Sequence, residues 1–404
     1  MISTKTDSEL GSLLMSLRGM QWIYGIKDDP YALLLRAESD DPHDLGRHAR
    51  AHGEVMWSMA DAWVTASYGT AAALLRDPRF GVRYPVPADG SDGEPTYEWQ
   101  LPALHKVLPL DEVYLAQERD EYRKLSALAR TAVGTDFAAG VAERCKEVLG
   151  RQDGAFDFMT EVAHPVAATA VAALLGVPSA EREHFVQLCV DTAPALDATV
   201  CPPRTPTARA LITAVEHVGA LLDAAGEGSG ADDRAVAGLF AVAGVQMAAN
   251  TAARTVALLL DHPESWARVQ QEPGRASDAV QEALRHSPPV RMLKLFAYED
   301  VELGGQPIEA GHDVVVLVEA AQRDPEAFPD PDRFDLDRPA GTPLLAFTDE
   351  LFTGPLEPLV RPLATAVVAT TVAQLPALRR TGPELRRLRS PMTGGVLHLP
   401  VSPC

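Results

Sequence analysis

Residues 282–285 read Glu-Ala-Leu-Arg, and residues 323–334 read Arg-Asp-Pro-Glu-Ala-Phe-Pro-Asp-Pro-Asp-Arg-Phe. The first stretch lies in an amphipathic helical pattern, and the second is rich in proline and aspartate, which favour turns.

Helical patterns dominate the chain on both sides of this stretch. The segment from Glu118 to about Leu260 is helical with breaks at glycine and proline, and Ala235–Leu260 is apolar nearly all round, which predicts a helix through the middle of the molecule. Strand patterns are few and short, beginning with a hairpin at 55–65. We expect a short helix followed by an irregular aromatic segment over 15–35, a long loop over 81–110 and a final core helix over 362–375. Because no clean linker interrupts the pattern, we predict one mainly α domain over residues 1–404 with small β-sheets, and residues 1–35 as an N-terminal extension.

Composition limits the partners that the chain can take. Its 404 residues carry 36 Lys and Arg against 56 Asp and Glu, a net charge of −20, which argues against nucleic acid and anionic membranes as partners. The arginines at 379–389 form the one local basic patch, and a solvated helix end or tail is the favoured interpretation. The four cysteines show no paired spacing, and no apolar run reaches 18 residues. We therefore expect a soluble cytoplasmic protein with reduced thiols.

Familiar catalytic and metal-binding patterns are missing from the sequence. No HExxH, GxSxG or glycine-rich phosphate loop occurs. His48 and His52 are four residues apart and could chelate a metal, but their arginine neighbours favour a solvated helix face. The sequence assigns no catalytic residue and no metal ligand.

The order of the remaining motifs resembles the cytochrome P450 family, the haem-thiolate monooxygenases, from about Trp63 to about Pro400. One ExxR motif alone is weak evidence, but the ordered series is specific. It consists of Ala62–Thr65, Leu75–Phe80, Leu174–Pro178, Ala243–Asn250, Glu282–Arg285, Glu299–Gly305 and Arg323–Phe334. The resemblance implies a P450-like fold. It also implies that Glu282, Arg285 and Arg333 form a buried salt-bridge network that ties the core to the stretch 323–334. Removing one member of such a network leaves an unpaired buried charge, which costs about 3–5 kcal/mol.

The same resemblance implies that this chain has lost the haem. Pro358-Leu-Val-Arg361 sets the register of the family's cysteine loop and places Gly354 where the ligand cysteine belongs. An empty haem slot would lower the stability of the fold by about 24 cal/mol per Å³ of cavity. Apolar residues at the former haem positions therefore suggest that side chains fill the slot and that no cofactor is bound. The altered haem positions are Tyr122 and Ser126 (propionate), Leu295 (propionate), Gln246 and Met247 (proton delivery), and Phe352, Gly354 and Leu356 (ligand loop).

The segments Arg18–Gly25, Asp28–Tyr31 and Arg389–Met392 resemble a smaller family, the P450-like auxiliary proteins of antibiotic sugar transfer. That resemblance implies a non-catalytic activator that binds a partner glycosyltransferase, which moves a nucleotide-activated deoxysugar, often an amino sugar, to a macrolide or related polyketide. Met20, Trp22 and Tyr24 are candidate partner contacts, although packing against the chain's own core would also explain the aromatic pair.

Two alternatives stay open on the sequence alone. The first is a haem monooxygenase with an atypical iron ligand. The second is a small-molecule binding module that uses what remains of the family's pocket. Bound haem would identify the first, and a large open cavity or a tightly held ligand would favour the second.

Overall fold

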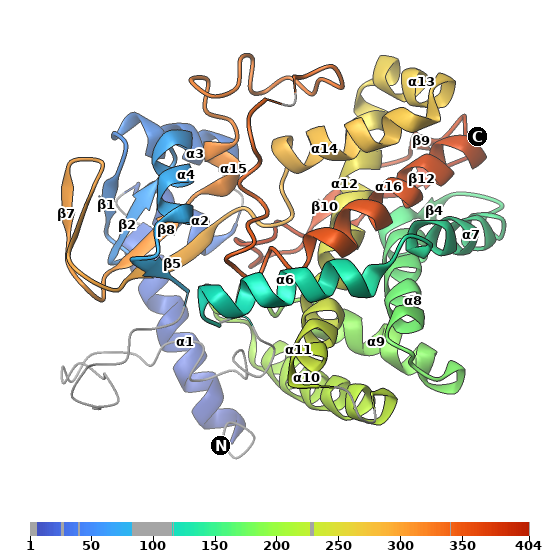
Figure 1. The fold of residues 1–404 in the computed structure, drawn as a ribbon. Helices are drawn as coiled ribbons and strands as arrows, with labels where there is room; N and C mark the ends of the chain where they lie inside the picture. Colours follow the sequence, from blue (N-terminus) through green and yellow to red (C-terminus); the bar gives the residue numbers. More distant parts are fainter. Residues whose placement is uncertain are drawn as a thin grey trace.

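A long apolar helix runs through the middle of the molecule (Figure 1). The computed structural model describes residues 6–25, 28–38, 41–82, 115, 117–226, 230–339 and 341–403. The central helix is built from α11 (Ala231–Leu239), a π-helical turn (Phe240–Gly244) and α12 (Val245–Asp261). In its most apolar 18-residue window 94% is buried, so this helix, although long enough to cross a membrane, is a core helix. The arrangement fits a soluble protein and confirms the predicted central helix.

The helices before α12 follow the predicted breaks at Gly134, Gly150, Gly176 and the segment 199–206, because each break supplies a glycine or proline at a helix end. They surround the central helix on one side of the molecule (Figure 1). These helices are α6 (Arg119–Val133), α7 (Phe137–Leu149), α8 (His164–Leu174), α9 (Arg182–Thr192) and α10 (Thr205–Ala225).

The C-terminal helices complete the core. The last of them, α16 (Glu357–Gln374), packs on α7 and α12. The sequence predicted its start at Pro362, but the helix begins five residues earlier and carries Pro362 inside it. Burial of its apolar face outweighs the one backbone hydrogen bond that the proline removes. The other helices here are α13 (Pro263–Gln271), α14 (Ala276–His286) and α15 (Val318–Ala321).

A five-stranded sheet lies beside the helical part, with the strand order β1-β2-β8-β5-β3. The predicted hairpin is confirmed, since β1 (Met56–Ser58) pairs antiparallel with β2 (Ala62–Thr65). The other strands of this sheet are β3 (Phe80–Gly81), β5 (Leu293–Ala297) and β8 (Asp313–Val316). Small sheets form from β4 (Phe156–Asp157), β6 (Val301–Leu303), β7 (Gln306–Ile308), β9 (Arg379–Arg380), β10 (Leu385–Arg386), β11 (Val396–His398) and β12 (Pro400–Ser402).

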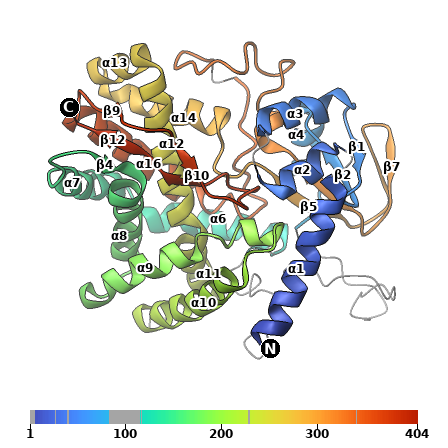
Figure 2. The same cartoon turned by 180° about the vertical axis from the view of Figure 1, so that it is seen from behind.

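The N-terminal segment forms three helices, α1 (Asp7–Tyr24), α2 (Pro30–Arg36) and α3 (Pro42–Ala51). Helix α1 lies at the edge of the molecule, where it packs against α2 and α10 (Figures 1 and 2). The sequence predicted a short helix followed by an irregular aromatic segment, and this was wrong, because Trp22 and Tyr24 lie in the last turn of α1. A capping box between Thr6 and Glu9 starts the helix earlier than the apolar pattern indicated.

The carboxylate of Glu282 is the centre of the expected salt-bridge network. Arg285 donates to both of its oxygens at 2.8 and 2.9 Å, and both side chains are almost fully buried. The second arginine is Arg338, whose Nε lies 3.1 Å from the same carboxylate, and not Arg333 as the sequence predicted. Arg333 is exposed and contributes its carbonyl oxygen, which accepts hydrogen bonds from both Arg285 and Arg338.

We predict that Arg338→Ala lowers the free energy of unfolding by about 3 kcal/mol, because it leaves the Glu282 carboxylate with one cation instead of two. Arg333→Ala is the matched control and should change that free energy by less than about 0.5 kcal/mol. Urea denaturation of both variants measures the difference. Equal losses in the two variants would contradict the assignment of Arg338.

Candidate functional site

The loop 347–356 stands where the family's cysteine loop would lie, and Gly354 has no room for a side chain. A Cβ atom on Gly354 would lie 2.5 Å from the Thr348 carbonyl oxygen and 2.7 Å from Ser126 Oγ. Both distances are far below a normal carbon contact. The backbone of the loop therefore packs directly on α6, and this position cannot present a thiolate toward the central helix.

Apolar side chains fill the space between this loop and the central helix. Leu351, Phe352 and Leu356 are all buried. Leu356 packs against Gly244, where an added Cβ would lie 3.4 Å from its methyl group and 2.6 Å from that of Leu359. Each buried side chain of this size contributes about 1.5–3 kcal/mol. Hydrophobic packing therefore joins the end of this loop to the central helix at Gly244.

Acidic residues of the same loop bind arginines on one face of α6. Glu350 forms ion pairs with Arg119 and Arg123, and Asp349 forms one with Arg130. The Arg119 side chain is buried and also donates to the carbonyl oxygens of Phe80 and Leu75. In P450 enzymes this helix is expected to bind a haem propionate; here the chain's own carboxylates occupy its arginines.

The sequence alone did not predict these ion pairs between the loop 347–356 and α6. The signal that could have found it is the spacing of Arg119, Arg123 and Arg130, which places them on one helical face, together with the adjacent acids Asp349 and Glu350. Only the fold shows that the two segments meet.

The other altered haem positions lie on three elements, α6, α12 and β5. Tyr122 and Ser126 are fully buried on α6, where the Tyr122 hydroxyl accepts from the Gln117 amide at 3.0 Å and Ser126 lies against Asp349. Gln246 and Met247 are buried on α12, and Gln246 donates to Asn250 at 3.2 Å. Leu295 is buried in β5 opposite Val314 and does not join the loop.

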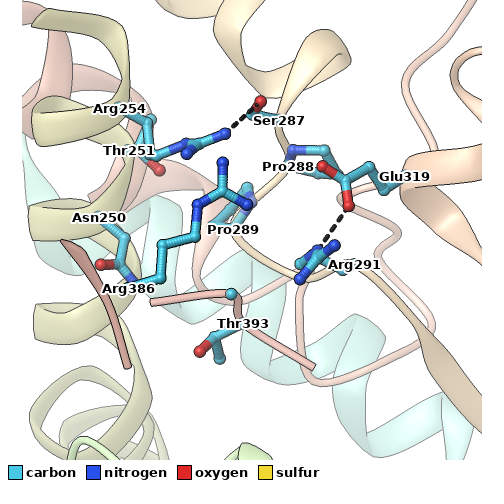
Figure 3. Close-up of a pocket in the computed structure, with 11 residues that line it drawn as sticks. Asn250, Thr251, Arg254, Ser287, Pro288, Pro289, Arg291, Glu319, Arg386 and Thr393 are labelled. Atoms are coloured by element: carbon cyan, nitrogen blue, oxygen red, sulfur yellow. Dashed lines mark hydrogen bonds and ion pairs between the residues drawn. The ribbon is translucent and has the colours of Figure 1, made fainter. Parts of the chain in front are cut away.

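A small polar pocket lies where α12 meets the segments 287–291 and 386–394 (Figure 3). Arg254 donates to Ser287 Oγ at 2.7 Å and pairs with Glu384, while Arg291 pairs with Glu319 at 2.5 Å. The cavity left between these side chains measures about 10 Å³. That is room for about one water molecule and for no organic substrate.

The described cysteines and histidines offer no replacement ligand. Cys145, Cys189 and Cys201 are buried, and burial raises the pKa of Cys145 and of Cys201 to about 12, so these thiols stay protonated. Burial lowers the pKa of His164 to about 4, and burial with the nearby Arg323 lowers that of His286 to about 2. Among the residues that the structure describes, no group of three or more His, Cys, Asp or Glu could hold a metal ion. The residues present do not fit a haem-thiolate centre.

The three candidate partner contacts lie near the end of α1. Trp22 is 42% exposed and Met20 37% exposed, and the Arg36 guanidinium stacks over the Trp22 ring at 4.1 Å. Tyr24 is partly buried, and that burial together with Asp61 raises the pKa of its hydroxyl. Packing thus accounts for Tyr24, whereas Trp22 and Met20 present apolar surface to solvent.

We predict that Gly354→Cys does not restore haem binding, because the added side chain has no space beside Thr348 and Ser126. It should lower the free energy of unfolding by about 1–3 kcal/mol through overpacking. Gly140→Cys is the control, since nothing lies within 4 Å of a Cβ at that helical position. Absorbance spectra after haem-supplemented expression and urea denaturation measure both effects. A stoichiometric haem band at undiminished stability would show that the loop can open.

Comparison with known proteins agrees with this fold. The sequence profile described as Cytochrome P450 matches residues 220–342. Among solved structures, P450BioI in complex with an acyl-carrier protein aligns with a TM-score of 0.72 at 25% identity, over 90% of this chain and 98% of that one. Epothilone B-bound P450epoK aligns with a TM-score of 0.75 at 22% identity, over 89% and 96%, which shows the fold alone.

Curated relatives cover almost the whole chain. Protein AknT of Streptomyces galilaeus is 41% identical over 98% of this chain and 96% of its own length. Protein DesVIII of Streptomyces venezuelae is 35% identical over 98% and 94%, and the cytochrome P450 family protein EryCII of Saccharopolyspora erythraea is 32% identical over 98% and 99%. These matches confirm the resemblance that the motifs indicated. The chain belongs to the cytochrome P450 family, in the group of P450-like proteins that includes AknT, DesVIII and EryCII.

Proposed function

We propose that this protein is a non-catalytic auxiliary protein that binds and activates a glycosyltransferase, which transfers a nucleotide-activated deoxysugar to a macrolide or related polyketide. Full-length similarity to AknT, DesVIII and EryCII supports the auxiliary role. The observation that carries the non-catalytic part is the packing of Gly354 against Thr348 and Ser126. A P450 fold without a place for its iron ligand has no means of activating oxygen.

The mechanism that we propose is stabilisation of the partner's competent state. A protein that binds only the folded, active conformation of its partner shifts the population toward that conformation by mass action. At a free concentration a hundred times its Kd, such a protein adds about 2.7 kcal/mol to the partner's stability. All chemistry then takes place in the glycosyltransferase.

The exposed end of α1 is the surface that we propose for this contact. Met15 (77%), Ile23 (58%) and Trp22 (42%) expose large apolar side chains on one helix, together with Met20. Aromatic and methionine side chains are enriched at the cores of protein interfaces. The opposite face of α1, with Leu10 and Leu14, is buried, and Gln21 anchors the helix to the Val200 carbonyl at 2.7 Å. The helix is therefore held rigidly while its outer face stays free.

We predict that sugar transfer by the glycosyltransferase rises at least about tenfold when this protein is added in stoichiometric amount, because more of the enzyme is in its competent state. The assay compares initial rates with and without this protein, and thermal unfolding of the glycosyltransferase alone and in the mixture. Equal rates and equal stability would refute the proposed role.

For the contact surface, Trp22→Ala should weaken binding of the glycosyltransferase by about 2 kcal/mol, as is usual for an aromatic residue at an interface centre. Trp57→Ala is the matched control, because Trp57 is 44% exposed and lies on β1, where it packs edge-on against Trp63. Titration calorimetry of both variants gives the two affinities. Activation that persists with unchanged affinity in Trp22→Ala would place the contact elsewhere.

A further inference from the structure

A surface pocket of about 300 Å³ lies between the segment 194–207 and the β10–β11 hairpin. It is separate from the small polar pocket of Figure 3, although Arg386 lines both. Pro194, Ala198 and Leu397 supply apolar wall on its two sides. Its volume is at the lower end of that of pockets which hold small organic ligands.

Arginines dominate the polar wall of this pocket. Arg204, Arg386, Arg387 and Arg389 all line it. Arg386 is paired with Glu384 at 3.0 Å. Among the residues that the structure describes, the other three guanidinium groups have no carboxylate within 4 Å. Three unpaired cations in one pocket stand out on a chain with a net charge of −20.

The one carboxylate in the pocket wall is already fully hydrogen-bonded. Asp197 is buried and accepts hydrogen bonds from the hydroxyls of Ser390 (2.6 Å) and Thr393 (2.7 Å) and from the amides of Met392 and Thr393 (2.9 Å each). Its role is to hold the hairpin against the segment 194–201. The charges of Asp197 and Glu38 partly offset those of Arg387 and Arg389, but among the described residues no carboxylate forms an ion pair with Arg204, Arg387 or Arg389.

The backbone of Arg389 adopts a disfavoured conformation. Its φ is +58°, in the left-handed region that favours glycine. Burial and the nearby cations Arg18 and Arg204 lower the pKa of its guanidinium. A charged side chain held in a disfavoured backbone conformation beside other cations points to a role in binding.

We propose that this pocket binds a small organic anion, whose apolar body lies against Pro194, Ala198 and Leu397 and whose phosphate or carboxylate group pairs with Arg204, Arg387 and Arg389. Guanidinium groups bind both kinds of anion through paired, charge-assisted hydrogen bonds. The proposal does not depend on the activator function, because the pocket lies within the isolated chain.

Titration calorimetry of the isolated full-length protein tests the proposal with three probes: uridine diphosphate, decanoate and inorganic pyrophosphate. We expect one site with a Kd below about 1 mM for uridine diphosphate or for decanoate, which distinguishes a phosphate from a carboxylate ligand. Binding of pyrophosphate alone would overturn the apolar part of the proposal. Failure of all three probes, including the case where the arginines bind only an acidic protein partner, would overturn it entirely.

Variants separate binding from folding. Arg389→Gly removes a cation and relieves the left-handed strain, so affinity for the probe should fall about tenfold or more while thermal stability stays equal or rises. Arg204→Ala should weaken binding in the same direction, and because Arg204 is exposed it should leave folding intact. Arg151→Ala, an exposed arginine away from the pocket, is the matched control and should leave the affinity unchanged. Equal affinity in all variants would contradict the site.

Discussion

The buried carboxylate of Glu282, shared by Arg285 and Arg338, is the interaction on which the rest of this structure depends. It joins α14 to the turn-rich segment 323–339 inside the protein, where an unpaired charge would greatly lower the free energy of unfolding. Arg285 also donates to the Gln322 carbonyl oxygen. The side-chain oxygen of Gln322 accepts from the backbone amides of Leu345 and Ala346, which extends the connection toward the loop 347–356. The path of the chain into α16 is thereby fixed.

Closure of the loop 347–356 on α6 follows from that path, and packing rather than charge supplies most of its stability. Burial of Leu351, Phe352 and Leu356 contributes about 1.5–3 kcal/mol each, whereas exposed pairs such as Asp349–Arg130 contribute at most about 1 kcal/mol. The ion pairs instead select the register of the loop, because Glu350 can reach Arg119 and Arg123 together only in one position. Within this loop, Gly354 has no space for a side chain.

Two surface features stand out among the described residues. The outer face of α1 is apolar, whereas the pocket beside the β10–β11 hairpin is cationic, so the two features suit different kinds of partner. They are physically connected, because α1 rests on the segment that forms one pocket wall through Gln21 on Val200 and Arg18 on Cys201. Any coupling between binding at the two places must be reciprocal.

Local patterns explain which elements were predictable from the sequence. The hairpin at 55–65, the helix breaks at glycine and proline and the apolar central helix depend on residues that are neighbours in the chain, and all three were predicted. The helical position of Trp22 was not, because the capping box of Thr6 and Glu9 started α1 before its apolar pattern begins. The predicted loop over 81–110 lies, apart from its first two residues, outside the described residues.

The sequence by itself determined the family and the mainly α fold, since these follow from residue identities in a fixed order. It also predicts that Gly354 stands at the family's cysteine position. Only the tertiary structure decided which side chains form ion pairs with Glu282 and with the arginines of α6. Arg338 instead of Arg333 reaches Glu282, and Asp349 and Glu350 meet the arginines of α6, because ion pairs between distant segments depend on how the backbone brings them together. The same reason explains the arginines of the hairpin pocket. The sequence predicts that the basic residues near the end of the chain are solvated, and only the fold shows that they face the segment 194–207 across a pocket.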